Sequence, residues 1–307
     1  MKYFTTKELS KILGYNDDSY IRKLIISGKL KADKIGRQWM VSEESVHEYN
    51  TRTKIRDKFK RLISFNYELR SQISDAIDSP RNLTGPKDAI VAFSVGKAFK
   101  TQGAILTLCE SGFGEDATAL VRTLFEIMVN TAYIRQDSTD ERAYRYLAYD
   151  WILRKKMFEY ATKKPEIVKV IEERGNGEDT KKIIEEVLLQ SKQVQDKYKY
   201  KNNKWSADDT ARMAELVGKS DAYNTIYRLE CQFSHSLVRV MNEYTKDSNE
   251  NGIVFNIGVT ENWVEENLVA TFDFMSNIYE NFCNQFGVKN DDLKTVVDNY
   301  LDFMKER

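Results

Sequence analysis

Residues 4–49 read FTTKELSKILGYNDDSYIRKLIISGKLKADKIGRQWMVSEESVHEY, and this stretch sets the organisation of the amino-terminal part of the chain. Apolar residues at helical spacing predict a first short helix that ends at Gly14 and a second helix over residues 19–26. Residues 30–35 and 38–41 alternate as the two short strands of a hairpin, and a capping-box-like run then opens a third helix. This order of elements is the plan of a winged helix-turn-helix.

The same stretch resembles the excisionase-type, MerR-like winged helix-turn-helix family. The resemblance rests on the patterns T-x-x-E-L-x-x-x-L-G and S-G-K-L-x-A-x-x-x-G-R-Q-W, and it covers about 50 residues. The recognition helix departs from the family, because Ser19-Tyr20-Ile21 stands where a small hydroxyl residue and Val are common. In such a module the recognition helix enters the major groove and the wing lies along the adjacent backbone or minor groove. The candidate DNA contacts are Ser19 and Tyr20 for base edges or methyl groups, and Arg22, Lys23, Lys31, Lys34 and Arg37 for phosphates or grooves.

The composition of the whole chain is that of a folded protein. Hydrophobic residues make up 41% of the 307 residues and aromatic residues 12%, which is too many for a disordered chain. Only 3 Pro and 14 Gly interrupt the sequence, which favours long helices over many short strands. We therefore expect a mainly α protein with a small winged helix-turn-helix domain followed by a large α-helical bundle.

The net charge of zero conceals an asymmetry along the chain. Residues 1–61 hold 15 Lys and Arg against 8 Asp and Glu, whereas residues 62–307 hold 32 against 39. The basic amino-terminal part is predicted to meet a polyanion, here double-stranded DNA. A homodimer is expected as well, since two-fold dimers read palindromic sites and one small module supplies few phosphate contacts.

The residues that the chain lacks exclude several classes of site. Cys109, Cys231 and Cys283 have no CxxC spacing, and His47 and His235 are the two histidines, so no metal and no cofactor is expected. Gly-rich phosphate loops and nucleophile elbows are missing, which argues against common hydrolase and nucleotide-dependent chemistry. No apolar run approaches a membrane span and no signal-like core opens the sequence, so we expect a cytoplasmic protein that has no membrane partner.

Helical patterns divide the rest of the chain. We expect a winged helix-turn-helix domain at residues 1–53, a connecting amphipathic helix at 54–84 and the α-helical bundle at 85–307. Further helices are predicted at residues 87–111, 115–136, 139–162, 165–174, 180–200, 208–217, 220–244, 262–286 and 291–305. The run KYKYKNNK, residues 197–204, is expected to be a solvated connector, and residues 252–259 a short extended segment.

The predicted helix at residues 115–136 is apolar almost all round, which marks a helix in the centre of a bundle. A polar stripe of Thr118, Arg122, Glu126 and Asn130 runs along it at four-residue spacing. A buried Arg without a partner costs several kcal/mol, so Arg122 and Glu126 are expected to pair.

A second polar face lies on the predicted helix at residues 220–244. Its members, Arg228, Gln232, His235 and Arg239, fall within a narrow sector of a helix. The Arg228-x6-His235 spacing resembles the R-x4-6-H signature of HEPN-type helical domains, several of which are metal-independent ribonucleases of toxin and antiphage systems. That resemblance implies that Arg228 would hold the scissile phosphate and His235 would act near the 2′-hydroxyl or the leaving group, across a dimer, with Arg122 and Glu126 in support. Leu229 departs from the family, which often has a polar residue there.

A further resemblance concerns most of residues 85–285. The pairing of GEDATALVRTLFEIMVNTAYI with a later YRLECQFSHS is similar to a bacterial helical family of unknown function, and it implies no established activity. Two other interpretations of the polar residues remain open beside the nuclease: a buried, hydrogen-bonded knot of Arg122, Glu126, Tyr227 and His235 that fixes helix register, or a small-ligand pocket.

Three functions follow from these observations. The first is a transcriptional-regulator-like DNA-binding protein whose helical domain dimerises or senses a ligand or partner. The second is a HEPN-like ribonuclease with RNA as substrate and a DNA-binding module for targeting or autoregulation. The third is a phage-type directionality factor with an architectural tail that meets other proteins. We favour the first.

Overall fold

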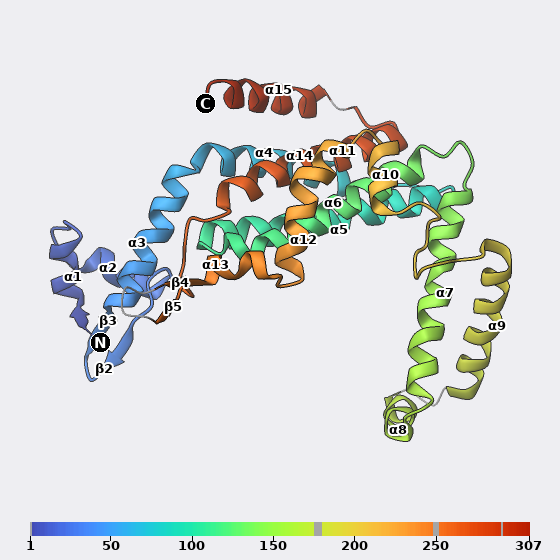
Figure 1. The fold of residues 1–307 in the computed structure, drawn as a ribbon. Helices are drawn as coiled ribbons and strands as arrows, with labels where there is room; N and C mark the ends of the chain where they lie inside the picture. The colour runs from blue at the N-terminus through green and yellow to red at the C-terminus, as the bar shows by residue number, and fades with distance from the viewer. Residues whose placement is uncertain (1, 175–179, 248–251, 290) are drawn as a thin grey trace.

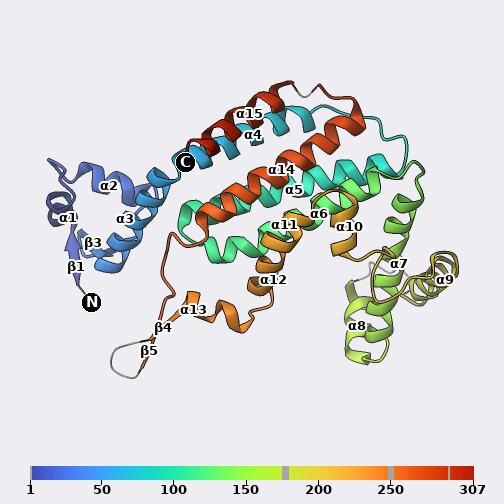
Figure 2. The same ribbon diagram turned by 45° about the horizontal axis from the view of Figure 1, so that its top comes forward.

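The computed structural model of the chain describes residues 2–174, 180–247, 252–289 and 291–307, and it is mainly helical, as the sequence predicts. The amino-terminal module lies at one end of the molecule, and a helical bundle fills the centre (Figure 1). A second view shows the carboxy-terminal helix α15 (Asp291–Lys305) beside α4 (Lys60–Ile77) on the surface of this bundle (Figure 2).

The amino-terminal module combines short helices with a small antiparallel sheet. Its elements are β1 (Tyr3–Thr5), α1 (Thr6–Ile12), α2 (Ser19–Ile26), β2 (Asp33–Ile35), β3 (Gln38–Ser42) and the start of α3 (Glu43–Lys58). The strand order is β1-β3-β2, with Phe4 opposite Val41 and Lys34 opposite Trp39. Strand β1 was not predicted, because three residues are too few to show the two-residue period of a strand. The buried core consists of Leu9, Ile21, Leu24, Ile25, Leu30 and Val41.

Helix α3 joins the module to the bundle. Its first turns place Val46 and Tyr49 against the core of the module, whereas Ile55 near its end belongs to the core of the bundle. The sequence predicts one connecting amphipathic helix at residues 54–84, but the structure divides this region between α3 and α4, because the backbone leaves the helical region at Phe59. The break lets the apolar faces of α3 and α4 reach the same core.

Three long helices form the centre of the bundle. They are α5 (Pro86–Ser111), α6 (Gly114–Arg135) and α14 (Val264–Phe286), and α4, α10 (Thr210–Leu216), α12 (Arg228–Ser234) and α15 pack around them. Phe125, Phe272 and Phe274 are fully buried, and the ring centroids of Phe125 and Phe274 lie 5.4 Å apart. The apolar, central helix that the sequence predicts at residues 115–136 is therefore α6.

A close backbone contact ties the start of α6 to the start of α14. A Cβ atom at Gly114 would lie 2.1 Å from the carbonyl oxygen of Asn262, so only glycine fits there without movement of the backbone. The Nδ2 of Asn267 donates to the Gly114 oxygen at 2.7 Å, and the Oγ1 of Thr118 donates to the same oxygen at 3.0 Å. The two helices are thereby held in one fixed register.

Helices α7 (Glu141–Ala161), α8 (Pro165–Arg174) and α9 (Thr180–Tyr198) project from the bundle as an arm (Figure 1). The run of residues 197–204 was expected to be a solvated connector, and this is wrong for its tyrosines, since Tyr198, the last residue of α9, and Tyr200 are buried. Arg145 of α7 donates to the Tyr198 oxygen at 2.7 Å, and its guanidinium lies 4.9 Å from the centre of the Tyr200 ring. Tyr149 of α7 also packs against Tyr200, with ring centroids 5.1 Å apart, so the tyrosines are buried against α7.

The continuous helix predicted at residues 220–244 is also wrong. The segment contains α11 (Ser220–Ala222), a π-helical turn η1 (Tyr223–Tyr227), α12, a 3-10 turn η2 (Val238–Val240) and α13 (Met241–Tyr244). Helix α12 ends because Ser236 has a left-handed φ of 49° and Leu237 is extended. Beyond α13, β4 (Thr245–Asp247) and β5 (Ile253–Phe255) pair as an antiparallel hairpin, where the sequence predicts only an extended segment.

Candidate nucleic-acid interface

Helix α2 has one buried and one exposed face. Ile21, Leu24 and Ile25 are buried in the core of the module, as their spacing predicts. On the exposed face Tyr20 rests against Tyr15, with ring centroids 4.5 Å apart. All the predicted DNA contacts are exposed, with Ser19, Tyr20, Arg22 and Lys23 on α2, Lys31 before the wing, and Lys34 and Arg37 on the wing.

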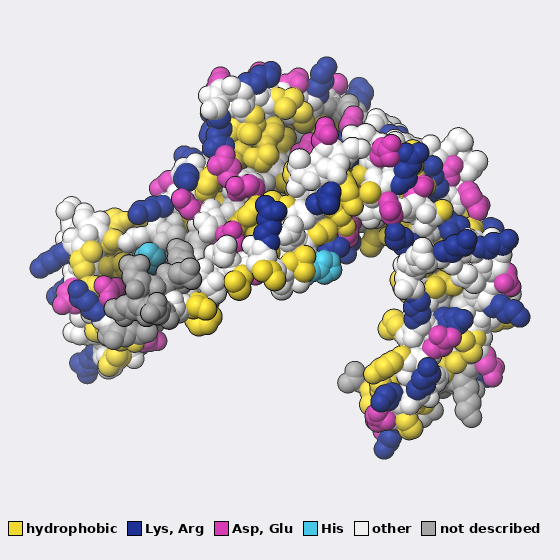
Figure 3. All heavy atoms as spheres, in the orientation of Figure 1, with side chains coloured by type: hydrophobic (Ala, Val, Ile, Leu, Met, Phe, Trp, Pro, Cys, Tyr) yellow, Lys and Arg dark blue, Asp and Glu magenta, His cyan; other side chains and the backbone are white. Residues whose placement is uncertain are grey.

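Positive charge is concentrated on α2 and the β2–β3 wing. Residues 19–37 contain six Lys and Arg and a single acidic residue, Asp33. Figure 3 shows Lys and Arg side chains spread over this end of the molecule. Gly36 has a positive φ of 61°, which forms the tight tip of the wing and places Arg37 at that tip. A surface of this kind attracts the phosphates of nucleic acid.

A small polar network fixes the start of α2. The Oγ1 of Thr6 donates to Asp18 at 2.6 Å, and Arg22 forms an ion pair with the same carboxylate at 3.0 Å. The hydrogen bonds from Thr6 and then from Arg22 lower the pKa of Asp18 below its ordinary value. Arg22 is therefore engaged within the module, whereas Lys23 and Arg37 have no ion pair or hydrogen bond from their side chains within the described part of the chain.

The polar stripe of α6 contacts a different segment of the bundle at each step. Thr118 reaches Asn267 of α14 at 3.2 Å, and the Oδ1 of Asn130 accepts a hydrogen bond from the Trp205 indole at 3.2 Å. Between them, Arg122 and Glu126 form the predicted ion pair at 3.1 Å. The stripe therefore links α6 to the segments that follow the arm and to α14.

Arg122 and Glu126 are part of a cluster with Tyr227 and His235. The Tyr227 hydroxyl donates to Glu126 at 2.9 Å, and Arg122 lies 3.4 Å from the Nε2 of His235. Because a guanidinium has only donors, this contact is a hydrogen bond in the tautomer whose Nε2 carries no proton. Burial alone would lower the pKa of Arg122, but the hydrogen bond to Tyr227 and the charge of Glu126 raise it.

This cluster is less buried than the sequence predicts. The side chains of Arg122 and Glu126 are 23% and 39% exposed, and His235 is exposed. The contacts that the hydrogen-bonded knot implies are present among the four residues, but of these only Tyr227 is buried.

Glu230 is a buried acid beside this cluster, and the sequence reasoning missed it. It is 3% exposed, and its Oε2 has no hydrogen-bond partner among the described residues. Burial raises its pKa to about 8, with an opposing contribution from the charge of Arg122. Its spacing from Tyr227, one helical turn away on the buried face of α12, was the signal that could have identified it.

The second polar face breaks up in the structure. Arg228 is exposed and makes no hydrogen bond or ion pair through its side chain within the described residues. Arg239 lies beyond the end of α12, in η2, so it does not extend the face. Arg228 is the first residue of α12 and His235 is its C-cap, so the two residues lie at opposite ends of this helix.

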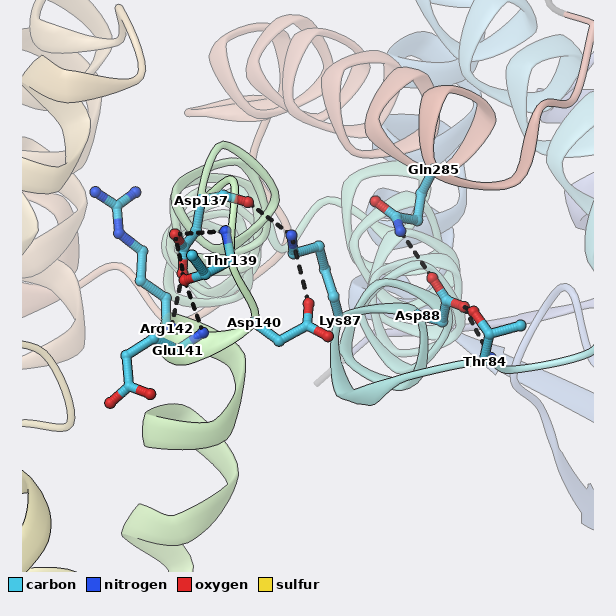
Figure 4. Close-up of polar contacts among 9 residues, drawn as sticks. All are labelled: Thr84, Lys87, Asp88, Asp137, Thr139, Asp140, Glu141, Arg142 and Gln285. Carbon is cyan, nitrogen blue, oxygen red and sulfur yellow. Dashed lines mark hydrogen bonds and ion pairs between the residues drawn. The ribbon is translucent and has the colours of Figure 1, made fainter.

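The root of the arm is held by polar contacts, which Figure 4 shows together with the neighbouring Asp88. The Nζ of Lys87 donates to the Asp137 carbonyl oxygen at 2.6 Å and lies 3.5 Å from the Asp140 carboxylate. The Asp137 carboxylate accepts from the Arg142 amide at 2.9 Å, which satisfies a free amide at the start of α7. These contacts attach the start of α7 to the start of α5.

A cavity of about 570 Å³ lies in the corner between the arm and the bundle. Four aromatic rings line it, from Phe93, Tyr146, Tyr149 and Trp205, together with the polar Asn130. Trp205 is held by Asn130 and packs edge-on against Tyr146 at 5.1 Å. Its size and aromatic lining with few polar groups are typical of small-molecule sites.

Within residues 2–174, 180–247, 252–289 and 291–307, no group of three or more His, Cys, Asp or Glu could hold a metal ion. None of the helices in these ranges is long and apolar enough to cross a membrane.

Two sequence families match the chain. Residues 88–253, more than half of the chain, match "Family of unknown function (DUF5677)", and residues 3–53 match "Helix-turn-helix domain". The first match contains the cluster on α6 and α12, and the second contains all the candidate DNA contacts. No curated protein and no solved structure matches the chain.

Proposed function

The chain belongs to the family of unknown function DUF5677 and carries a DNA-binding helix-turn-helix domain, and from this premise we propose that it is a sequence-specific transcriptional regulator that binds duplex DNA as a two-fold dimer. The observation that carries the proposal is the exposed, basic face of α2 and the wing. Two modules related by a two-fold axis can place their recognition helices in successive major grooves. In this arrangement Ser19 and Tyr20 face base edges, and Lys23, Lys34 and Arg37 face phosphates.

The helical domain is the sensing part in this proposal. The aromatic cavity between arm and bundle supports it, because its walls are held by packing and by the Asn130–Trp205 hydrogen bond. A ligand there would contact α5, α6 and α7 at once, and α5 also packs against the end of α3. Occupation of the cavity is thus connected to the helix that carries the module.

Binding measurements on the full-length chain test the DNA part of the proposal. A target is first selected from random duplexes, and affinities are then measured by fluorescence anisotropy over a range of salt. Lys23→Ala and Arg37→Ala should each weaken binding and lower the salt slope by about one, as expected for a lost phosphate contact. Lys100→Ala, an exposed lysine on α5, is the matched control and should bind like the wild type. Wild-type affinity in both Lys23→Ala and Arg37→Ala would refute the proposed interface.

The α6–α12 cluster favours a second candidate function, a metal-independent ribonuclease of the HEPN type. The specific observation is the contact of Arg122 with the His235 imidazole at 3.4 Å, with Arg228, which has no side-chain partner among the described residues, at the other end of α12. A neutral imidazole can accept the proton of an attacking 2′-hydroxyl. The wild type should then cleave RNA without added metal. Loss of this cleavage in both His235→Ala and Arg228→Ala, at an unchanged melting temperature, would establish this function. Absence of cleavage by the wild type would leave the cluster with a structural role.

A further inference from the structure

The β4–β5 hairpin and the turns before it expose an unusually apolar surface. Eight residues, each between 38% and 83% exposed, form what we term the hairpin patch: Leu237, Val238, Met241, Tyr244, Ile253, Val254, Phe255 and Ile257. Figure 3 shows hydrophobic side chains gathered along this lower edge of the molecule. A soluble monomer rarely exposes so much apolar surface in one region.

Strand β5 adds an unpaired edge to this surface. Ile253, Val254 and Phe255 are exposed although they alternate between the two faces of the strand, and within the described residues β5 pairs with β4 alone. A two-stranded hairpin by itself is marginally stable in water. Another strand would form hydrogen bonds with the free edge of β5 and would bury its apolar side chains.

The hydrogen-bonding pattern identifies which backbone groups are free. The Asn256 amide donates to the Tyr244 oxygen at 2.9 Å, and the register places Lys246 opposite Val254. Hydrogen-bonded pairs alternate along an antiparallel ladder, so Val254 directs its backbone groups toward β4. The amides and carbonyls of Ile253 and Phe255 then point away from β4, along the open edge.

We propose that the hairpin patch is the dimer interface, and that β5 pairs antiparallel with β5 of a second copy of the chain about a two-fold axis at Val254. This places Ile253 opposite the second copy's Phe255 as a hydrogen-bonded pair, and the two Val254 residues face each other as a non-hydrogen-bonded pair. The pairing is isologous, as a closed dimer requires. The inference rests on the dimer of the proposed function and names the surface that forms it.

Two observations select a second copy as the occupant. Large apolar side chains each offer roughly 150–250 Å² when free, so the hairpin patch presents on the order of 1,000 Å², whereas a stable interface needs about 800 Å² per partner. The strand is also self-complementary, because the two-fold pairing brings apolar residues only against apolar residues. The polar sequence Thr245-Lys246-Asp247 makes the opposite edge, β4, a poor candidate.

The hairpin also lies where a dimer axis would bring two DNA-binding modules together. Thr260, soon after β5, donates its amide to the Gly112 oxygen at 2.9 Å. The next residue, Glu261, pairs with Lys58 at the end of α3 at 3.1 Å. The interface therefore stands close to the helix that leads into the module.

Cross-linking in the full-length chain tests this pairing. Non-hydrogen-bonded pairs bring Cα atoms to about 4.5 Å, within the range of a disulfide, so Val254→Cys should form a covalent dimer on mild oxidation. Lys246→Cys, opposite Val254 on β4, is the matched control and should remain uncross-linked. The wild type is the second control, since Cys109 and Cys283 are buried and any cross-link through the half-buried Cys231 would appear in it as well.

Light scattering after size-exclusion chromatography gives an independent measurement. The wild type should be a dimer. Phe255→Glu should raise the dissociation constant of the dimer by about tenfold or more, because it buries unpaired carboxylates in the interface. The melting temperature of the monomeric variant should stay unchanged. A monomeric wild type, or a dimer that Phe255→Glu leaves intact and Val254→Cys does not cross-link, overturns the inference. DNA affinity is measured separately. A monomeric wild type that binds DNA would overturn the dimer of the proposed function together with this interface, whereas a dimeric wild type that neither variant affects would overturn this interface alone. Lys23→Ala should stay dimeric when DNA binding is weakened.

Discussion

Replacement of Glu230 by Gln should stabilise the protein, and the gain should grow with pH. Glu230 is 3% exposed and its pKa is raised from 4.5 to about 8 by burial, so the folded protein resists ionisation of this carboxyl while the unfolded chain ionises freely. The wild type therefore holds its full stability below pH 4.5 and loses stability as pH rises toward 8. Glutamine keeps the shape of the side chain and never ionises.

The size of the effect follows from the shift in pKa. One unit corresponds to about 1.4 kcal/mol, so the difference in unfolding free energy between the two proteins should rise from near zero at pH 4.5 to roughly 3 kcal/mol at pH 7 and about 5 kcal/mol at pH 9. Other titrating groups are common to both proteins, and their contributions cancel in the difference.

Urea unfolding at pH 5, 7 and 9, followed by circular dichroism, measures this difference. Arg122→Met provides a second variant in the opposite direction. The charge of Arg122 lowers the pKa of Glu230, so its removal should raise that pKa further and extend the loss of stability to higher pH. Parallel stability curves for the wild type and Glu230→Gln from pH 5 to pH 9 would refute the assignment of Glu230 as a buried, neutral acid.

Three further substitutions probe the bundle and the arm. Gly114→Ala should cost about 3 kcal/mol or prevent folding, because its Cβ meets backbone, whereas Gly96→Ala, with open space around it, should be neutral or stabilising in thermal melts. Glu126→Ala should lower unfolding free energy by only about 1 kcal/mol in urea titrations, since its pair with Arg122 is partly exposed, and a loss several times larger would show that the cluster is buried. Arg145→Met removes the donor to the carbonyl oxygens of Tyr198, at the end of α9, and of Trp205, and should accelerate hydrogen exchange of the amides in this segment. Unchanged exchange would contradict the anchoring role of Arg145.

Local chemistry made much of the fold predictable. Gly14, Gly28 and Gly36 lie where the backbone of the module turns with a positive φ. The positions of these glycines and the spacing of the apolar residues between them were therefore enough to place the helices and the hairpin. In the bundle, the four-residue period of the α6 stripe correctly predicted the Arg122–Glu126 pair.

Tertiary contacts decided the features that the sequence did not reveal. The end of α12 depends on the left-handed backbone at Ser236, a residue type that carries no strong signal for that conformation. Tyr198 and Tyr200 lie in a lysine-rich run whose composition is typical of a solvated segment, and they are buried against Arg145 and Tyr149 of α7, which are distant in the sequence. The partial exposure of Glu126 likewise follows from how far α12 extends over α6, which no local pattern contains.

Because α3 connects the amino-terminal module to the bundle, the position of α2 depends on how α3 packs against the bundle. A helix of 16 residues is about 24 Å long, so a tilt of about 10° at Phe59 would displace its far end by about 4 Å. That displacement is comparable to the 3.4 Å rise of one base step along a DNA strand. In the proposed dimer, a small rearrangement of side chains in the core around Ile55 would thus be amplified into a change in the half-site spacing that the two modules span.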